Sequence, residues 1–413
     1  MKSYPGISGR LFQTLGKNGI NVVAIAQGSS ELNISFVVKN EDVAKAQNAV
    51  HNVFFLSKNR QINLFIVGVG LIGGTLIEQV KTQRSSLKEK RNLEINIIGL
   101  ANSKQMLFDE NGINTEDWKS SLGHGQTMDI TQFISKMKTM NLSNSIFIDN
   151  TGNNEISAHY ESILDASISI STPNKTAASS TYQNYLSLKE LANKRNVQFM
   201  YEANVGAGLP IISTLNDLVS TGDEIMKIEG VLSGSLSYIF NSFNLETNFN
   251  DIVIKAKELG FTEPDPREDL SGKDVARKIT ILAREAGYPI EIGEVSIEAI
   301  LTESCMQASS VDAFFKALEK QNSTLKDKLK TANEENKKLR FIAKYENGNA
   351  NIELRAVDKN SPFYNLFGSD NMLVFTTKRY NKTPLVIRGP GAGAQVTAAG
   401  VFAEIIRIAN YMS

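Results

Sequence analysis

Residues 65–74 have the sequence F-I-V-G-V-G-L-I-G-G and belong to an apolar run that begins at Ile62. The run predicts a buried strand followed directly by a helix. Gly68 suits a tight turn, Gly70 lets a ligand approach the backbone, and Gly73 lets the helix pack closely. Because the N-terminus of a helix attracts phosphate, the stretch predicts a pyrophosphate site on a Rossmann-type α/β fold.

The next predicted strand, at residues 95–100, bears on which dinucleotide would bind. It ends in A-N-S-K and lacks the acidic residue that usually holds the ribose hydroxyls of NAD. Lys104 could meet a 2′-phosphate instead, which favours NADP over NAD. Two alternatives stay open, because Asn102 could serve an adenosine ribose and an exposed lysine is a common surface feature.

Two later strands are expected to end at the same edge of the sheet. The strand at 146–148 leads into D-N-T, and the strand at 168–171 leads into T-P-N-K. Open parallel sheets receive ligands at the carboxyl ends of their strands, so Thr151 would face the cofactor. The proline makes the second turn rigid and would present Lys175 over the same edge, although a loop lysine is usually solvated.

The composition excludes several classes of function. The chain has 413 residues, of which 41% are hydrophobic, and 44 basic residues balance 44 acidic ones. A net charge of +0 gives no field that favours nucleic acid or an anionic membrane. Cys305 is the only cysteine, and the chain has no apolar signal segment, so we expect a cytosolic protein. Three histidines and one cysteine make a transition-metal site improbable.

A second informative stretch, residues 260–278, reads G-F-T-E-P-D-P-R-E-D-L-S-G-K-D-V-A-R-K. Pro264 and Pro266 restrict the backbone, so Glu263 and Asp265 are expected on a stiff loop with their carboxylates held at defined angles. Many acids and lysines therefore meet in a turn followed by a helix, which is typical of a site.

The helix after this loop should bring an acid and a lysine together. Ser271 is expected to cap it, with Asp274 at the reciprocal capping-box position. Lys278 lies one turn beyond Asp274 on the same face, beside the apolar stripe, where its amine would be partly desolvated. A simple solvated ion pair worth about 0.2–0.5 kcal/mol is the alternative.

The run at 263–278 resembles the signature of homoserine dehydrogenase. Other segments resemble that family in the same order: 65–74, I-D-N-T-G at 148–152, S-T-P-N-K-T-A at 171–177, Y-E-A-N-V-G-A-G-L-P-I-I-S at 201–213, and G-P-G-A-G-A-Q-V-T-A-A-G at 389–400. Together they are spread over nearly the whole chain after residue 60. One glycine motif is weak evidence, whereas six motifs in order are specific.

The resemblance implies an oxidoreductase that interconverts aspartate 4-semialdehyde and L-homoserine, a step of threonine, methionine and isoleucine biosynthesis. It assigns Lys278 as proton donor, Asp274 as its partner and Lys175 as an assistant. Glu263, Asp269 and Gly260 would bind the substrate. The implied contacts of NADP, or of NAD as the second possibility, are Gly68, Val69, Gly70, Leu71, Ile72, Gly73, Ala101, Lys104, Thr151, Lys175 and Gly391.

The family also has a monovalent-cation site, usually for sodium. Carried over, it falls on Glu202, Val205, Ala207 and Leu209, mainly through backbone oxygens, in a loop of small residues that can turn carbonyls inward. A hinge between domains is the alternative for this loop. The family further implies a homodimer or a higher homo-oligomer.

Residues 1–59 are expected to form a separate module. A helix at 9–15, strands at 20–26 and 32–38, and a helix at 41–50 are predicted. The order resembles the last amino-acid-sensing ACT module of an aspartokinase, without the strand that opens such a module. We therefore expect a truncated chain or fragment without kinase activity. Threonine is the implied effector, with Asn21 and Gln27 near its pocket or merely at strand ends.

The remaining expectations concern domains. Residues 60–205 and 385–413 would form the dinucleotide-binding domain, and 206–384 an α+β domain for substrate binding and dimerisation. Within the latter, a helix at 251–259 and strands at 228–232 and 352–357 are predicted, and K-D-K-L-K-T-A-N-E-E-N-K-K-L-R, ending at Arg340, reads as a solvated helical face.

Two other functions remain open. Another semialdehyde reductase, of the aspartate or saccharopine type, could use the same scaffold, although the E-P-D-P-R segment disfavours it. An inactive regulatory fragment could sense an amino acid through the module at residues 1–59.

Overall fold

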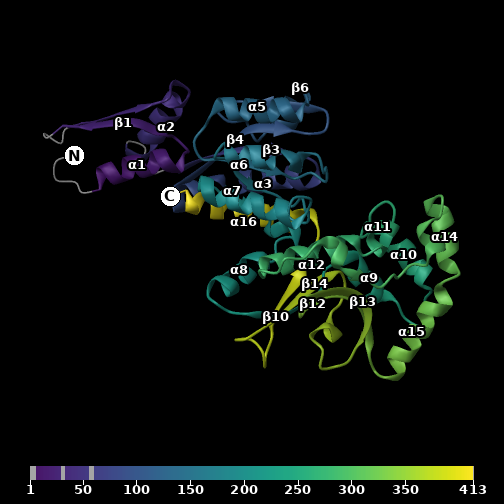
Figure 1. Cartoon of the computed structure of the whole chain (residues 1–413). Coiled ribbons are helices and arrows are strands. Elements are labelled where there is room, and N and C mark those ends of the chain that lie inside the picture. The colour runs from purple at the N-terminus through teal and green to yellow at the C-terminus, as the bar shows by residue number, and fades with distance from the viewer. Residues whose placement is uncertain (1–5, 29–32, 55–59, 413) are drawn as a thin grey trace. The chain divides into compact units, whose positions relative to one another are not determined.

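The computed structural model describes residues 6–28, 33–54 and 60–412. The chain divides into two compact units (Figure 1). The first unit comprises Met1–Ala177, Asn184–Tyr201 and Ala398–Ser413, and the second comprises Ala178–Gln183 and Glu202–Thr397. The expected mixture of α/β and α+β architecture is confirmed.

The N-terminal module of the first unit is a two-stranded antiparallel sheet with two helices. Its elements are α1 (Ile7–Lys17), β1 (Val22–Gln27), β2 (Ile34–Val38), a 3₁₀ turn (Asn40–Asp42) and α2 (Val43–Phe54). Leu11, Leu15, Ile20 and Ala46 form its small core. The predicted order of helix, strand, strand and helix is confirmed, while residues 29–32 of the connection between the strands lie outside the described residues.

The rest of the first unit is a seven-stranded sheet in the order β6-β5-β4-β3-β7-β8-β9. Its strands are β3 (Arg60–Val67), β4 (Leu93–Ala101), β5 (Gln105–Phe108), β6 (Gln126–Thr127), β7 (Ser145–Asp149), β8 (Ser169–Ser171) and β9 (Phe199–Met200). Pairings among β3, β4, β7, β8 and β9 are parallel. The chain goes from β3 to β4 on one side and later returns to β7 on the other. This reversal leaves a switch point between β3 and β7, where doubly wound sheets bind ligands.

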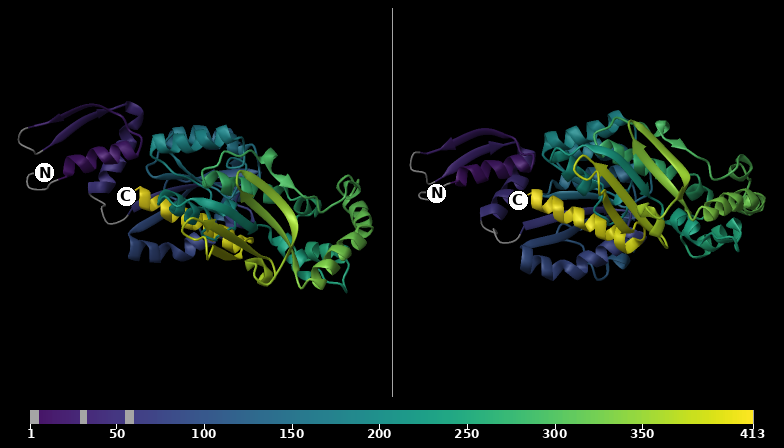
Figure 2. Two further views of the ribbon diagram at one scale, coloured as in Figure 1. Left: turned by 60° about the horizontal axis from the view of Figure 1, so that its bottom comes forward. Right: turned by 90° about the horizontal axis from the view of Figure 1, so that it is seen from below.

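Helices cover this sheet and bury its apolar strands. They are α3 (Leu71–Arg91), α4 (Trp118–Gly123), α5 (Ile130–Met140), a 3₁₀ turn (Ile156–His159), α6 (Tyr160–Asp165), α7 (Tyr182–Arg195) and α16 (Ala394–Tyr411). Although α16 comes from the far end of the chain, it packs on the first unit (yellow in Figures 1 and 2). Glu404 of α16 accepts a short hydrogen bond from Ser171 Oγ, and Arg60 donates to the Ala409 carbonyl.

The second unit is built on a six-stranded sheet in the order β11-β13-β12-β10-β14-β15. Its strands are β10 (Ile225–Val231), β11 (Ser296–Ile297), β12 (Lys338–Glu346), β13 (Asn349–Val357), β14 (Asp370–Thr377) and β15 (Leu385–Pro390). All pairings are antiparallel except that of β11 with β13.

In the second unit, α9, α12 and α15 pack along β12, while α10 contacts α9, α14 and α15. Figure 1 shows the helices of this unit. They are α8 (Ile212–Ser220), α9 (Gly234–Ser242), α10 (Phe249–Glu258), α11 (Arg267–Leu270), α12 (Lys273–Glu285), α13 (Glu303–Met306), α14 (Val311–Glu319) and α15 (Asn322–Glu334). Short 3₁₀ turns occur at Glu202–Asn204, Ile292–Glu294 and Pro362–Asn365. None of the helices in the described ranges is both long and apolar enough to span a bilayer.

Two expectations differ from the structure. The lysine- and glutamate-rich run that ends at Arg340 is not one helical face, because it passes from α15 into β12, where Arg340 is buried among backbone carbonyls. Residues 385–390 were expected in the dinucleotide-binding domain, but they form an edge strand of the second unit's sheet, paired with β14.

Candidate functional site

The glycine-rich turn after β3 has the geometry of a ligand cradle. Gly68 has φ +88°, and a Cβ there would lie 2.7 Å from Cγ2 of Thr151. A Cβ at Gly73 would lie 2.2 Å from the Gly68 carbonyl oxygen, so the start of α3 can approach this turn only with glycine there. A Cβ at Gly70 would meet no atom within 4 Å. The outer glycines are needed for packing, whereas the middle one faces open space.

The turn after β7 is tied to this cradle by a buried carboxylate that sequence reasoning had not singled out. Asp149 Oδ1 accepts hydrogen bonds from Thr151 N at 2.9 Å and Oγ1 at 2.6 Å, while Oδ2 accepts from the Tyr160 hydroxyl at 2.7 Å. Burial raises the pKa of Asp149, and these hydrogen bonds oppose the rise. Its position at the end of an apolar strand was the available signal.

The neighbouring Asn150 supplies a further indication of a ligand. Its side-chain amide nitrogen and oxygen are both buried without a hydrogen-bond partner in the described part of the chain. The nitrogen lies 3.3 Å from the position that a Cβ at Gly73 would occupy. An unsatisfied buried amide is costly, so a polar group bound at this turn would relieve it. The turn therefore fits a dinucleotide.

At the end of β4, the side chain of Asn102 has a structural role. Its Oδ1 accepts hydrogen bonds from Lys104 N at 2.7 Å and Gln105 N at 2.8 Å, so the side chain closes its own turn. Lys104 is exposed. Lys104, predicted to meet a 2′-phosphate, thus extends toward solvent, whereas Asn102, the alternative for the ribose, uses its side-chain oxygen within the turn.

The turn that carries Lys175 is fixed by side-chain hydrogen bonds. Thr172 Oγ1 donates to the Asp149 carbonyl at 2.7 Å, and Asn174 Nδ2 donates to Asp149 Oδ2 at 3.1 Å. Asn174 Oδ1 accepts from Thr176 N at 3.0 Å. Lys175 is half-buried at this rigid turn, at the carboxyl edge where it was predicted.

In the second unit, Lys278 lies on α12 with only 8% of its surface exposed. Its Nζ lies 2.8 Å from Asp274 Oδ2 and donates to the Leu232 carbonyl at 2.7 Å. The predicted pair of Asp274 and Lys278 is confirmed. The alternative of a fully solvated pair is wrong, because the lysine is desolvated while the Asp274 side chain is 48% exposed.

The predicted cap of this helix is wrong. α12 begins at Lys273, and its N-cap is Gly272 with φ 72°, without a side-chain cap. Ser271 Oγ donates to the Glu268 carbonyl at 2.7 Å, which closes the short helix α11, and accepts only a longer hydrogen bond from Lys273 N at 3.3 Å. The chain turns between two consecutive helices at this point through a left-handed backbone conformation. Glycine adopts this conformation readily, whereas serine does not.

The loop before α12 holds the predicted substrate residues. Asp269 Oδ2 accepts from Glu263 N at 2.9 Å, and Oδ1 accepts from Ser235 Oγ at 2.7 Å. Burial raises the pKa of Asp269, and the Asp274 charge adds to the rise. The Glu263 side chain is exposed beside it, and Gly260, with φ +73°, lies just beyond the end of α10. Asp269 therefore holds the backbone of this loop.

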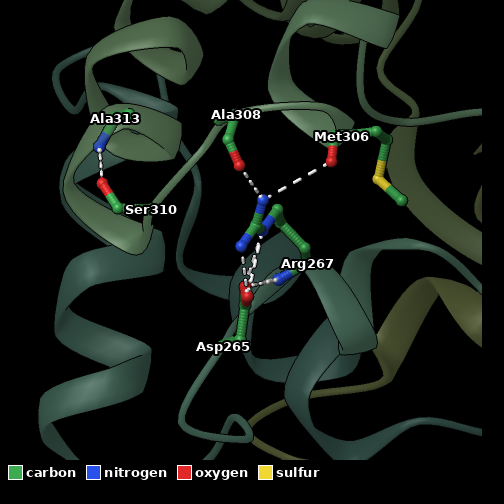
Figure 3. Close-up of polar contacts among 6 residues, drawn as sticks. All are labelled: Asp265, Arg267, Met306, Ala308, Ser310 and Ala313. Atoms are coloured by element: carbon green, nitrogen blue, oxygen red, sulfur yellow. Dashed lines mark hydrogen bonds and ion pairs between the residues drawn. The ribbon is translucent and has the colours of Figure 1, made fainter.

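An arginine that sequence reasoning passed over clamps this loop (Figure 3). Arg267 Nε lies 2.9 Å from Asp265 Oδ1, and its NH2 group lies 2.5 Å from Oδ2. NH1 donates to the Ala308 carbonyl at 2.5 Å and more weakly to Met306. Hydrogen bonds from Arg267 lower the pKa of Asp265. Asp265 is thus committed to holding the loop.

Gly391 has a packing role that the sequence did not reveal. A Cβ there would lie 2.1 Å from the side chain of Asn371. Asn371 is fully buried and donates from Nδ2 at 3.2 Å to the Leu232 carbonyl, which Lys278 also uses. Gly391 belongs to the second unit, and its contact with a nicotinamide stays a prediction.

The loop predicted to hold a cation is tightly turned. Gly206 and Ala207 have φ values of 74° and 54°. The buried Glu202 carboxylate accepts the N–H groups of Ile211 and Ile212 at 2.7 and 2.6 Å, so it caps α8. Because the Glu202 carboxylate is used in this way, backbone carbonyl oxygens remain as the ligands for the predicted monovalent cation. Within the described ranges, no group of three or more His, Cys, Asp or Glu residues could hold a metal.

Family models match in three places. "Homoserine dehydrogenase" matches residues 210–406, "Homoserine dehydrogenase, NAD binding domain" matches 68–202, and "ACT domain" matches 1–54. Each of the two enzyme matches covers the greater part of one structural unit.

Similar curated proteins carry the same names. A homoserine dehydrogenase of Schizosaccharomyces pombe is 38% identical over 84% of this chain and 95% of its own length. Bifunctional aspartokinase/homoserine dehydrogenases of Arabidopsis thaliana and Haemophilus influenzae are each 43% identical, over 100% and 98% of this chain. The chain spans 45% and 50% of the length of those two relatives, that is, about half.

Solved structures share the fold. A Candida auris protein of unknown function is 35% identical, with a TM-score of 0.78, over 85% of this chain and 98% of that one. A hyperthermophilic archaeal homoserine dehydrogenase in complex with NADPH has a TM-score of 0.65 over 84% of this chain and 97% of its own, and at 23% identity it supports the fold alone.

Proposed function

Since this chain belongs to the homoserine dehydrogenase family of oxidoreductases, we propose that it interconverts aspartate 4-semialdehyde and L-homoserine with a nicotinamide cofactor. The observation that carries the proposal is the Lys278 ammonium, nearly buried between a carboxylate and a carbonyl oxygen. Such a group can donate a proton to an alkoxide that forms beside it.

Lys278 would act as the proton donor in the reducing direction. An ammonium has three N–H donors, and the Leu232 carbonyl and Asp274 carboxylate account for two of them. The third can then reach the substrate oxygen. Asp274 would hold the amine in position and balance its charge, which matters because an unpaired buried charge is costly. Lys175 would assist by polarising the same carbonyl.

The substrate's amino-acid end carries an ammonium, which acidic side chains can grip. Asp269 would bind it with the oxygen lone pairs left by Ser235 and Glu263 N, and the exposed Glu263 carboxylate would add a second contact. Gly260 would let the backbone of this loop come close to the substrate. Because the loop fixes the directions of these hydrogen bonds to the substrate ammonium, it would orient the aldehyde toward Lys278.

NADP is the cofactor that we propose, with NAD as the alternative. When bound, the reduced nicotinamide supplies the hydride to the aldehyde carbon. The pyrophosphate would lie over Gly68, Gly70 and Gly73 at the N-terminus of α3, where Asn150 has unsatisfied polar atoms. Lys104 would meet the 2′-phosphate, and the remaining predicted contacts are Val69, Leu71, Ile72, Ala101, Thr151, Lys175 and Gly391.

The finer assignments extend this proposal. A monovalent cation, which the family resemblance implies is sodium, would be held by carbonyls of Glu202, Val205, Ala207 and Leu209. We further propose a homodimer or higher homo-oligomer in the cytosol. Threonine would act through the ACT module, with Asn21 and Gln27 near its pocket.

Replacing Lys278 by Ala or Gln tests the proton-donor role. Because the proton must then come from water, kcat should fall by at least about a hundredfold. The Kd for NADPH should change less than threefold. Exposed Lys273, on the first turn of the same helix, provides the matched control Lys273→Ala, which should retain normal kcat. Unchanged turnover in the Lys278 variants would refute the role.

A further inference from the structure

A polar cavity in the first unit lies at the opposite end of the sheet from the cofactor turn. Asn144 precedes β7 and Ser169 begins β8, so the cavity is at the amino ends of these strands, while Gly68 follows the carboxyl end of β3. The other walls come from the segment between α7 and β9, from the end of α1, from α2 and from the chain at the end of α16. The cavity is therefore separate from the proposed active site.

The cavity has room for a small ligand. Its volume is about 70 Å³. Since about 10–15 Å³ already admits one water, the cavity has room for several waters or for a small anion such as phosphate or a short carboxylate. Amides from Asn18, Asn144, Asn196 and Gln198 line it. The amide nitrogens of Asn18 and Asn144 each use one N–H on a backbone carbonyl and keep a second one that a ligand can accept.

Lys45, on α2, is the charged group that the cavity leaves uncompensated. It is 8% exposed, and its Nζ makes no hydrogen bond or ion pair with any residue that the structure describes. Burial lowers the pKa of Lys45, and the Asp42 carboxylate only partly opposes this. A buried ammonium without a partner is costly, so an anion beside it would be stabilising.

The chemistry of the lining selects an anion over an amino acid. Lys17 brings a second amine, and no described lining residue carries a carboxylate. A zwitterion such as threonine would place its ammonium among these donors with nothing acidic to receive it. An oxyanion would instead accept from the amine and the amides, which form charge-assisted hydrogen bonds.

We propose that this cavity binds a small oxyanion, a carboxylate or a phosphate, through the Lys45 ammonium and the surrounding amide groups. The ligand would join α2 of the N-terminal module to the strands β7 and β8. This proposal does not depend on the reaction proposed above.

Inorganic phosphate and acetate, titrated into the full chain at constant ionic strength, test the proposal. Isothermal calorimetry and the thermal unfolding midpoint should both report saturable binding of at least one of them. Phosphate binding would assign a phosphate ligand and acetate binding a carboxylate. Absence of saturable binding of either anion would overturn the proposal, whatever the behaviour of any variant.

Variants locate the site. Lys45→Met should weaken the binding at least tenfold, whereas Lys45→Arg should keep most of it. Lys39→Met is the matched control, because Lys39 lies in the same module, is 64% exposed and pairs with Glu41 on the surface. Equal affinity in Lys45→Met and wild type would contradict the proposal, as would threonine binding in competition with the anion.

Discussion

At the scale of single residues, the candidate site relies on charges that are already paired before any ligand binds. Lys278 has Asp274 and the Leu232 carbonyl, and Arg267 has Asp265 and the Ala308 carbonyl. Charged side chains held in this way lose little further freedom when a substrate arrives. The first pair would perform chemistry, while the second would hold the loop in place.

Replacing Arg267 by Lys should affect substrate binding more than the chemical step. Lysine keeps the charge but lacks the planar fork that reaches Asp265 and the Ala308 carbonyl together. The KM for homoserine should rise several-fold with a smaller change in kcat and none in the Kd for NADPH. Arg277→Lys, on the exposed face of α12, should leave all three unchanged. A fall in kcat alone would argue against a positioning role.

The ion pair of Asp265 with Arg267 predicts that the stability of the fold depends on pH. Hydrogen bonds from Arg267 lower the pKa of Asp265 below its ordinary 3.8, so the pair stabilises the fold above that pH. This contribution is lost as the pH falls through the lower, folded-state pKa. Asp265→Asn should be less stable than wild type to urea at pH 7, and the two unfolding midpoints should approach each other as the pH falls below 3.8. Parallel midpoints over this range would contradict the assignment.

Sequence reasoning reached the pair of Asp274 and Lys278 because helical spacing fixes which side chains are neighbours. It did not reach the partnership of Lys278 with the Leu232 carbonyl or the clamp by Arg267, because both join segments far apart in the chain. The incorrect cap at Ser271 has a local cause, since Gly272 separates two helices where one was expected.

At the scale of elements, the turn between β3 and α3 was the most predictable feature. Its three glycines were assigned distinct roles, and the clashes that a Cβ would make at Gly68 and Gly73 agree with the packing roles. The buried position of Arg340 in β12 was not predictable, since charged residues usually mark a solvated face. Desolvation lowers the pKa of Arg340 to about 10.

Alanine at the glycines should separate folding from cofactor binding. Gly70→Ala should leave the thermal unfolding midpoint unchanged while weakening NADPH at least tenfold, because the methyl group would enter the space left for the pyrophosphate. Gly73→Ala should lower the midpoint, since its Cβ would lie 2.2 Å from a backbone oxygen. Gly123→Ala, with nothing within 4 Å, is the control. Unimpaired NADPH binding by Gly70→Ala would exclude the proposed cradle.

At the scale of the whole molecule, the first unit is completed by the end of the chain. α16 buries Val401, Ile405 and Ile408 fully in this unit. The assignment of residues 385–413 to the dinucleotide-binding domain predicted this return, but its boundary at residue 385 came too early. Residues 385–390 read L-V-I-R-G-P without a polar and apolar alternation, and only their pairing with β14 reveals the sheet to which they belong.

Ile405→Ala tests how far the first unit depends on α16. The substitution removes methyl and methylene groups from a fully buried position and leaves a cavity, so the unit should be destabilised by about 2–5 kcal/mol. Ala403→Gln, at an exposed position of the same helix, should have a small effect. Urea denaturation monitored by NADPH binding would measure the loss, and equal stability of the two variants would mean that the helix contributes little.

Homoserine-dependent reduction of NADP and of NAD by the purified full chain, with and without threonine, is the most direct measurement. We expect turnover with a preference for NADP that Lys104→Ala reduces. Absence of turnover with either cofactor would contradict the proposed activity and favour another semialdehyde substrate or an amino-acid-sensing fragment.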